Sequence, residues 1–191
     1  MANTKVYHSG VTIILASASP RRAELLAAAG FTFDVDPAHV DETPIDGEAA
    51  GAYARRLACD KARAVAARHP GRVVLAADTV VVLDRRIFGK PADRADAARM
   101  LRELSGRDHE VLTAVAVARD GAVDEHLEST WVRFAPMSAD EVAWYVASGE
   151  ADDKAGAYGI QGLASRFVTR IDGSYTNVVG LPVAAVHRML K

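Results

Sequence analysis

The feature that most constrains the fold is a long apolar segment with a carboxylate in its middle. The run "RVVLAADTVVVLD", residues 72–84, is rich in β-branched residues and predicts a buried strand. Asp78 interrupts this run, and a buried carboxylate is costly unless a cation or strong hydrogen-bond donors accompany it. Metal coordination or general-base duty would account for the charge. The plainer alternative is an aspartate that caps a turn at the strand end.

The pattern on both sides of this strand predicts a mixed α/β sheet flanked by helices. The length of 191 residues suits one domain with one core, preceded by an N-terminal tail over residues 1–10. A hairpin is expected with its turn near residues 120–121. Further strands are expected over residues 11–17, 31–37, 87–89, 109–121, 126–137 and 166–173, and helices over 20–29, 49–68, 93–104, 138–148 and 181–190.

Composition excludes several classes of protein. The formal net charge is -2, which gives no electrostatic basis for binding nucleic acid or a membrane surface. One cysteine, Cys59, excludes an internal disulfide framework and a cysteine-rich zinc site, and it is expected to be a small core residue. Trp131 and Trp144 are also expected in the core. Apolar runs are too short to span a bilayer, and residues 1–10 lack the apolar centre of a signal peptide, so cytoplasmic residence is expected.

The junction "ILASASPRRAELL", residues 13–25, has the residue types of an anion site. Ser19 and Pro20 are typical of the start of a helix, where unpaired N–H groups and a partial positive charge favour phosphate. Ser17 adds a hydroxyl, and the guanidinium groups of Arg21 and Arg22 suit bidentate phosphate contacts. A plain capped helix with solvated arginines is the alternative.

Acidic residues that follow the second expected strand could complete a metal site. Asp41 and Glu42 lie in the loop "VDET". If this loop faces Asp78, Glu42 and Asp78 could hold Mg²⁺ or Mn²⁺, with phosphate oxygens and water as the other ligands. A solvated acidic loop is the alternative.

Three lysines and one glutamine are further candidates. Lys61, Lys90 and Lys154 could neutralise phosphate charge, although a solvated side chain is the plainer alternative for each. The segment "FGKP" around Lys90 is not a Walker A loop, because a proline follows the lysine and Asp84 replaces the first glycine. Gln161 could contact the edge of a base.

Seven ordered segments together resemble the Maf family of nucleoside triphosphate pyrophosphatases, also described as septum-formation-inhibitor proteins. The resemblance extends from about residue 11 to the C-terminus. It implies a Maf/inosine-triphosphatase-like fold: an elongated mixed sheet flanked by helices, with a cleft between two lobes. The segments are "ILASASPRRAELL", "VDET", "ACDKA", "AADTVVVLD…FGKP", "LRELSGRDHEVLTAVAV", "DDKAGAYGIQG" and "GSYTNVVGLP".

The resemblance also implies a reaction and roles for individual residues. The reaction is hydrolysis between the α- and β-phosphates with a divalent cation, Mg²⁺ or Mn²⁺. Asp78 matches the catalytic proton acceptor and a possible metal ligand, and Glu42 matches a metal ligand. The positions that match phosphate-binding residues are Ser17, Arg21, Arg22, Lys61, Lys90 and Lys154.

Three positions indicate the substrate. Arg22, Thr79 and Gln161 resemble the subgroup that acts on dTTP and UTP, and modified pyrimidine triphosphates are further candidates. Family members are often dimers, so a homodimer is expected, with no nucleic-acid or membrane partner. Two alternatives remain: a non-catalytic protein that senses nucleotides or regulates septum formation, and a hydrolase for purines such as ITP.

Overall fold

The computed structural model describes residues 12–191, which are built around one mixed sheet of seven strands. The strand order is β2-β1-β3-β5-β6-β7, and β4 pairs with β3. β1 is parallel to β2 and β3, whereas the other pairs are antiparallel. The expected tail over residues 1–10 lies outside the described residues. The strands are β1 (Ile13–Leu15), β2 (Phe33–Val35), β3 (Val74–Leu83), β4 (Arg86–Phe88), β5 (Asp108–Arg119), β6 (Ala122–Phe134) and β7 (Val168–Asp172).

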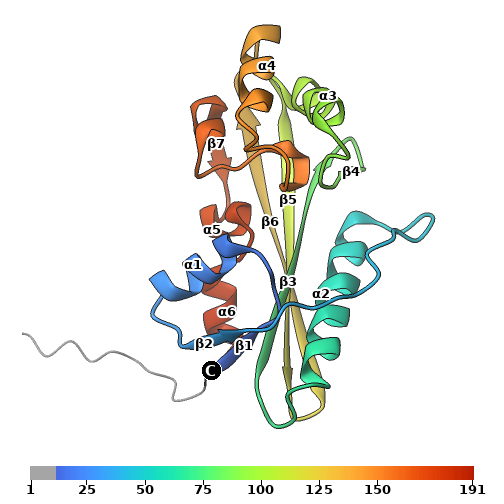
Figure 1. The fold of residues 1–191 in the computed structure, drawn as a ribbon, viewed down its shortest axis with the longest axis vertical. Helices are drawn as coiled ribbons and strands as arrows, with labels where there is room; N and C mark the ends of the chain where they lie inside the picture. Colours follow the sequence, from blue (N-terminus) through green and yellow to red (C-terminus); the bar gives the residue numbers. More distant parts are fainter. Residues whose placement is uncertain (1–11) are drawn as a thin grey trace, which may run out of the picture.

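Helices cover both faces of the sheet, as the sequence predicts (Figure 1). In the lower half α2 lies on one face and α1 and α6 on the other, whereas α3 and α4 gather with β4 and β7 at the upper end (Figure 1). The short helix α5 and two 3₁₀ turns were not expected. Across residues 12–191, no helix has the length and hydrophobicity needed to cross a bilayer. The helices are α1 (Pro20–Ala28), α2 (Ala50–Ala66), α3 (Arg94–Leu104), α4 (Ala139–Ala147), α5 (Tyr175–Val179) and α6 (Val183–Met189), and the 3₁₀ turns are η1 (Ala155–Ala157) and η2 (Leu163–Phe167).

The helix α2 packs closely on the sheet because alanines line both surfaces of the contact. Ala54, Ala58 and Ala62 follow the four-residue spacing of one helix face, and each is fully buried. They belong to one core cluster with Ala76 of β3 and Ala114 of β5. Small side chains on both surfaces let the helix backbone approach the strands.

The edge of β3 has a gap in its pairing. β1 pairs with β3 as far as Leu75, and the pairing with β4 begins at Val81. On that side, residues 76–80 therefore have no strand beside them, although β5 pairs with them on the other side. Backbone polar groups in the gap are open to side chains. The gap lies where the sheet passes from its lower half to its upper half.

Two tryptophans that were expected in the core are exposed. Trp131 is 51% exposed because it alternates along β6 with Val132, whose side chain is fully buried on the other face. Trp144 on α4 is 41% exposed, and the Arg166 guanidinium lies 4.4 Å from the centre of its ring. Cys59 is partly buried against the core cluster of α2, as expected.

His109 on β5 is a histidine that the core keeps neutral. Its side chain is fully buried, with its ring centre 5.0 Å from that of Phe134 and its Nε2 2.9 Å from the Tyr158 hydroxyl. Burial lowers its pKa from 6.5 to about 4. Between these pH values the unfolded chain binds more protons than the folded one, so stability falls as the pH drops through this window.

We predict that, because of this histidine, the free energy of unfolding falls by about 2 kcal/mol when the pH is lowered from 7 to 5. His109→Gln removes the titrating group and keeps a hydrogen-bonding side chain beside Tyr158. Urea unfolding of both proteins at pH 7, 6 and 5 measures the difference in slope. Parallel pH profiles would contradict the assignment of a neutral buried histidine.

Candidate functional site

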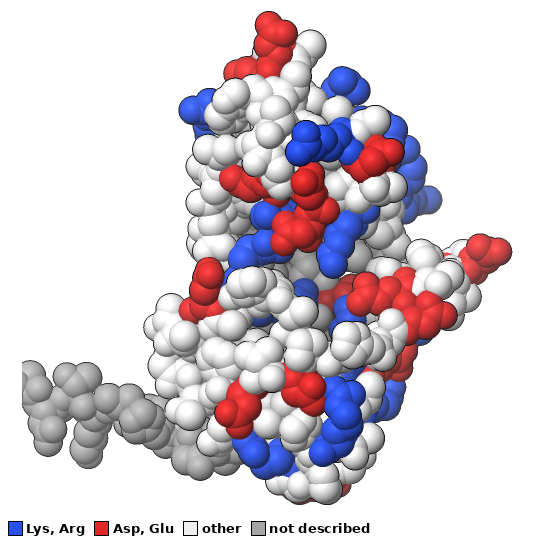
Figure 2. Space-filling model, viewed as in Figure 1, with Lys and Arg blue, Asp and Glu red and all other residues white. Residues whose placement is uncertain are grey.

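A cleft of about 490 Å³ opens at the gap in the edge of β3. This volume is within the range of small-molecule sites. Figure 2 shows a hollow at mid-height, with basic and acidic side chains around it. All ten residues to which the resemblance assigns a role line the cleft, whereas Asp41 does not. The ten are Ser17, Arg21, Arg22, Glu42, Lys61, Asp78, Thr79, Lys90, Lys154 and Gln161.

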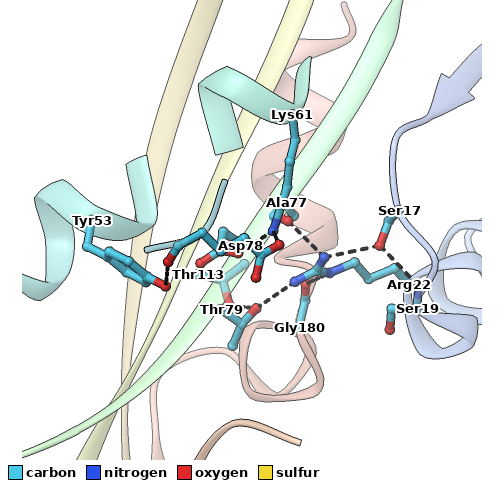
Figure 3. A network of polar contacts seen from close by, with 11 residues as sticks. Ser17, Ser19, Arg22, Tyr53, Lys61, Ala77, Asp78, Thr79, Thr113 and Gly180 are labelled. Atoms are coloured by element: carbon cyan, nitrogen blue, oxygen red, sulfur yellow. Dashed lines mark hydrogen bonds and ion pairs between the residues drawn. The ribbon is translucent and has the colours of Figure 1, made fainter. Parts of the chain in front are cut away.

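The floor of the cleft holds a buried carboxylate with its cation. Asp78 is 7% exposed and lies in the middle of β3, so the alternative of a turn cap at the strand end is wrong. Lys61 of α2 is also buried, and its Nζ donates to Asp78 Oδ1 at 2.7 Å (Figure 3). The same Nζ lies 2.7 Å from Glu42 Oε1. Burial alone would raise the pKa of Glu42, but the hydrogen bond and charge of Lys61 outweigh it and lower that pKa.

Adjacent residues of β3 serve opposite faces of the sheet. Ala76 and Val80 pack in the cluster under α2. Asp78 lies between them in the alternation of the strand, so its side chain points to the same face and contacts Lys61. Ala77 packs in the cluster under α1, and Thr79, two residues further along the strand, points to the same face. Thr79 accordingly faces α1.

Arg22 of α1 binds protein atoms with most of its donors. Its Nε donates to the carbonyl of Gly180 at 2.9 Å, and its Nη1 donates to the carbonyl of Ala77 at 2.8 Å, in the gap of β3. Nη1 also donates to Ser17 Oγ at 3.1 Å, and Nη2 donates to Thr79 Oγ1 at 3.1 Å (Figure 3). Burial lowers its pKa, whereas the charge of Asp78 opposes this effect. The alternative of a solvated arginine is wrong for Arg22, which ties α1 to β3 and to the end of α5.

The β1–α1 junction presents the start of a helix to the cleft. Ser17 is buried, and its Oγ accepts from the Ser19 N–H at 3.2 Å. Ser19 occupies the N-cap position of α1, as expected, but its side chain makes no capping hydrogen bond. Because no side chain caps this end, backbone N–H groups of the first turn remain available to an anion.

The opposite wall supplies more cations and one acid. Lys154 Nζ donates to Asp153 Oδ1 and to the carbonyl of Glu150, both at 2.7 Å. Arg21 Nη1 lies 3.3 Å from Asp153 Oδ2, so this pair links α1 with the segment before η1. Burial would raise the pKa of Asp153, but Lys154 and Arg21 together lower it. Lys90 follows β4 and is exposed at the same cleft.

The charge balance of the cleft favours a polyanion. Five basic and three acidic side chains line it, although the whole chain has a formal net charge of -2. Gln161 lies in the loop of residues 159–163, and its side chain is exposed. Within residues 12–191, no hydrogen bond engages the Gln161 amide, which leaves it available to a ligand.

Sequence reasoning missed some of the residues around this site. Tyr53 precedes Lys61 by two helical turns, and its hydroxyl donates to the Glu42 carbonyl at 2.9 Å (Figure 3). Their eight-residue spacing could have indicated a shared helix face. Asp153 was also missed, although it adjoins a predicted lysine. Thr113 Oγ1, 3.0 Å from Thr79 Oγ1, gave no signal, because cross-strand register was unknown.

The fold and cleft define an α/β protein with a site for an anionic ligand that carries several negative charges. The chain belongs to the Maf family, since the model of Maf-like proteins matches residues 12–191. A protein of Koribacter versatilis named dTTP/UTP pyrophosphatase is 55% identical over 185 residues, which cover 97% of this chain and 96% of the relative.

A second relative agrees with this assignment, and one solved structure shares the fold. A dTTP/UTP pyrophosphatase of Geobacter metallireducens is 56% identical over 177 residues, covering 91% of this chain and 92% of the relative. The structure of the Staphylococcus aureus Ham1 protein has a TM-score of 0.54 at 13% identity and covers 94% of this chain and 97% of its own. This likeness confirms the expected fold.

We predict that two adjacent arginines differ in their contribution to stability. Arg22→Lys leaves carbonyl groups of the β3 gap and of Gly180 without donors, and each such loss costs about 1–3 kcal/mol. Arg21→Lys disturbs a single exposed ion pair, worth about 1 kcal/mol or less. Urea unfolding of both variants provides the comparison. Equal losses would show that the Arg22 hydrogen bonds do not hold α1 to the sheet.

Proposed function

We propose that this protein hydrolyses dTTP and UTP, and related modified pyrimidine triphosphates, to the monophosphate and pyrophosphate. The observation that carries the proposal is the juxtaposition of the Lys61–Asp78–Glu42 cluster with the basic β1–α1 junction in one cleft. The names of relatives that share more than half of its residues support the substrates. We also propose a cytoplasmic enzyme with no nucleic-acid or membrane partner, because its substrates are cytoplasmic metabolites and its formal net charge is -2. That the enzyme is a homodimer is proposed from the family resemblance alone.

The phosphates of the substrate would lie along the basic walls. Arg21 and Lys154 both bind the carboxylate of Asp153. When the substrate binds, its phosphate oxygens would replace this carboxylate as the acceptor for the two side chains. Lys90 and the start of α1 with Ser17 would take further oxygens. Phosphoanhydride hydrolysis depends mainly on positioning and charge stabilisation, which these groups would supply to the departing pyrophosphate.

Asp78 would accept a proton from the attacking water. One of its oxygens, Oδ1, accepts from Lys61, and among the described residues no hydrogen bond engages Oδ2. In the proposed step Oδ2 accepts a proton from a water molecule as that water attacks the α-phosphorus. The bond between this phosphorus and the bridging oxygen breaks, and pyrophosphate leaves. Lys61 fixes the orientation of the carboxylate through its hydrogen bond to Oδ1.

The oxygen ligands present fit a divalent cation shared with substrate. Glu42 and Asp78 both contact the Lys61 nitrogen, and these two carboxylates would hold one Mg²⁺ or Mn²⁺. Among residues 12–191 no group of three His, Cys, Asp or Glu side chains could enclose a metal, so phosphate and water must supply the remaining ligands. When bound, the cation would polarise phosphate oxygens and reduce their repulsion of the attacking water.

Gln161 and Thr79 would select the base of the nucleotide. Thr79 Oγ1 is fixed between Arg22 and Thr113, so it is a rigid contact at the gap of β3. Gln161 can donate and accept, as the edge of a uracil or thymine base requires. Sites built on specific hydrogen bonds can reject the wrong partner by several orders of magnitude.

We predict that Asp78→Asn lowers the kcat for pyrophosphate release from UTP by about 10²–10⁴-fold, the usual contribution of a general base. UTP binding, measured by calorimetry, should persist, because the cations of the walls remain. Asp84→Asn, in the exposed turn between β3 and β4, is the matched control. Near-normal turnover in Asp78→Asn would refute the base assignment, and no pyrophosphate release by the unaltered protein would favour a nucleotide sensor. Comparing UTP and dTTP with ITP tests the purine alternative.

We predict that Glu42→Gln raises the Mn²⁺ concentration needed for half-maximal activity by about tenfold or more, because a hard anionic ligand is lost. With UTP present in both samples, the electron paramagnetic resonance signal of free Mn²⁺ should show that Glu42→Gln binds Mn²⁺ more weakly than the unaltered protein does. Asp46→Asn removes a carboxylate from the same loop, outside the cleft, and should leave both values unchanged. Unaltered metal dependence in Glu42→Gln would remove this residue from the metal site.

A further inference from the structure

We propose that Tyr145 and Glu150 are positioning residues that hold the loop of residues 159–163, the Gln161 loop, in the shape that presents Gln161 to the base. This inference rests on the proposed function, since it concerns how that same site selects its base. Neither residue lines the cleft. Both therefore act through the loop and not by touching the substrate.

The two side chains hold both ends of the Gln161 loop. At one end the Gly159 N–H donates to the Tyr145 hydroxyl oxygen at 3.2 Å. At the other end the Leu163 N–H donates to Glu150 Oε2 at 2.9 Å. The Tyr145 hydroxyl donates to Glu150 Oε1 at 3.1 Å, which joins the two anchors. Gln161 lies midway between the anchored amides.

The anchors are rigid because Tyr145 is part of the core. Its side chain is fully buried in the cluster formed with α3 and the upper strands, and its ring packs edge-on to Phe167 at 6.4 Å. Its hydroxyl reaches the loop at Gly159. A hydrogen bond at the border of the core is costly to leave unmade, so the loop backbone is fixed relative to α4.

The glycines of "YGIQG" allow this close approach. A Cβ added at Gly162 would lie 2.3 Å from Glu150 Oε1, inside the carboxylate itself. A Cβ at Gly159 would lie 2.7 Å from Cε of Lys154. A side chain at either of the two glycines that flank Ile160 and Gln161 would displace Glu150 or Lys154 from its present position.

Glu150 also connects the loop with the phosphate side of the cleft. Its backbone carbonyl accepts from Lys154 Nζ at 2.7 Å, while its carboxylate holds the Leu163 N–H. One residue thus sets the position of a phosphate-facing cation and of the base-facing loop. Weakening the carboxylate contacts alone should change base choice more than triphosphate affinity.

Tyr145→Phe tests the proposal, because it removes the hydroxyl and keeps the buried ring. We expect the ratio of kcat/KM for UTP to that for GTP to fall about tenfold, the effect of one lost hydrogen bond. Tyr175→Phe is the matched control, because Tyr175 is exposed and lies outside the cleft. In a Gln161→Ala background, Tyr145→Phe should lower the ratio no further, since both changes act through the same side chain.

Amide hydrogen exchange provides a measurement that does not depend on catalysis. The Gly159 amide should exchange at least about tenfold faster in Tyr145→Phe, whereas amides of β3 should keep their rates. Glu150→Gln, with the Leu163 amide as its reporter, gives the same comparison if Tyr145→Phe does not fold. An unchanged Gly159 exchange rate together with an unchanged UTP-to-GTP ratio would overturn the positioning role. Absence of UTP hydrolysis in the unaltered protein would instead overturn the proposed function, and the exchange rates would still decide whether the anchors hold the loop.

Discussion

The ion pair between Lys61 and Asp78 is the interaction on which the arrangement of the site depends. Removing either partner would leave the other buried without its counter-charge, which typically costs several kcal/mol. The pair can form only because alanines bring α2 close to β3. Glu42 adds a second carboxylate to the same lysine from a partly exposed loop. The packing of the lower half and the chemistry of the cleft therefore have a common origin.

The gap in the pairing of β3 explains why the cleft lies where it does. Strand alternation sends Asp78 toward α2 and Thr79 toward α1, so two neighbouring residues contribute to two separate networks. The Arg22 side chain takes the place of a missing strand by binding the Ala77 carbonyl. A sheet that was paired along its whole edge would have no space for a ligand at this position, and the lobes above and below would form one continuous surface.

Sequence reasoning predicted the features that follow from local pattern. The strand around Asp78 and the helix α2 both follow from periodicity, and the structure confirms them. Features that depend on register or on distant partners were not predicted. Trp131 was wrongly expected in the core, because its hydrophobicity gave no information on which face of β6 it occupies. The partners of Arg22 come from segments 55 and 158 residues away, and no local pattern identifies them.

The central claim is that water attacks the α-phosphorus of a nucleotide bound in this cleft. Hydrolysis of UTP in ¹⁸O-labelled water, followed by mass spectrometry of the products, tests it most directly. The account predicts one labelled oxygen in the uridine monophosphate and none in the pyrophosphate. Label in the pyrophosphate, or release of labelled orthophosphate in its place, would contradict it.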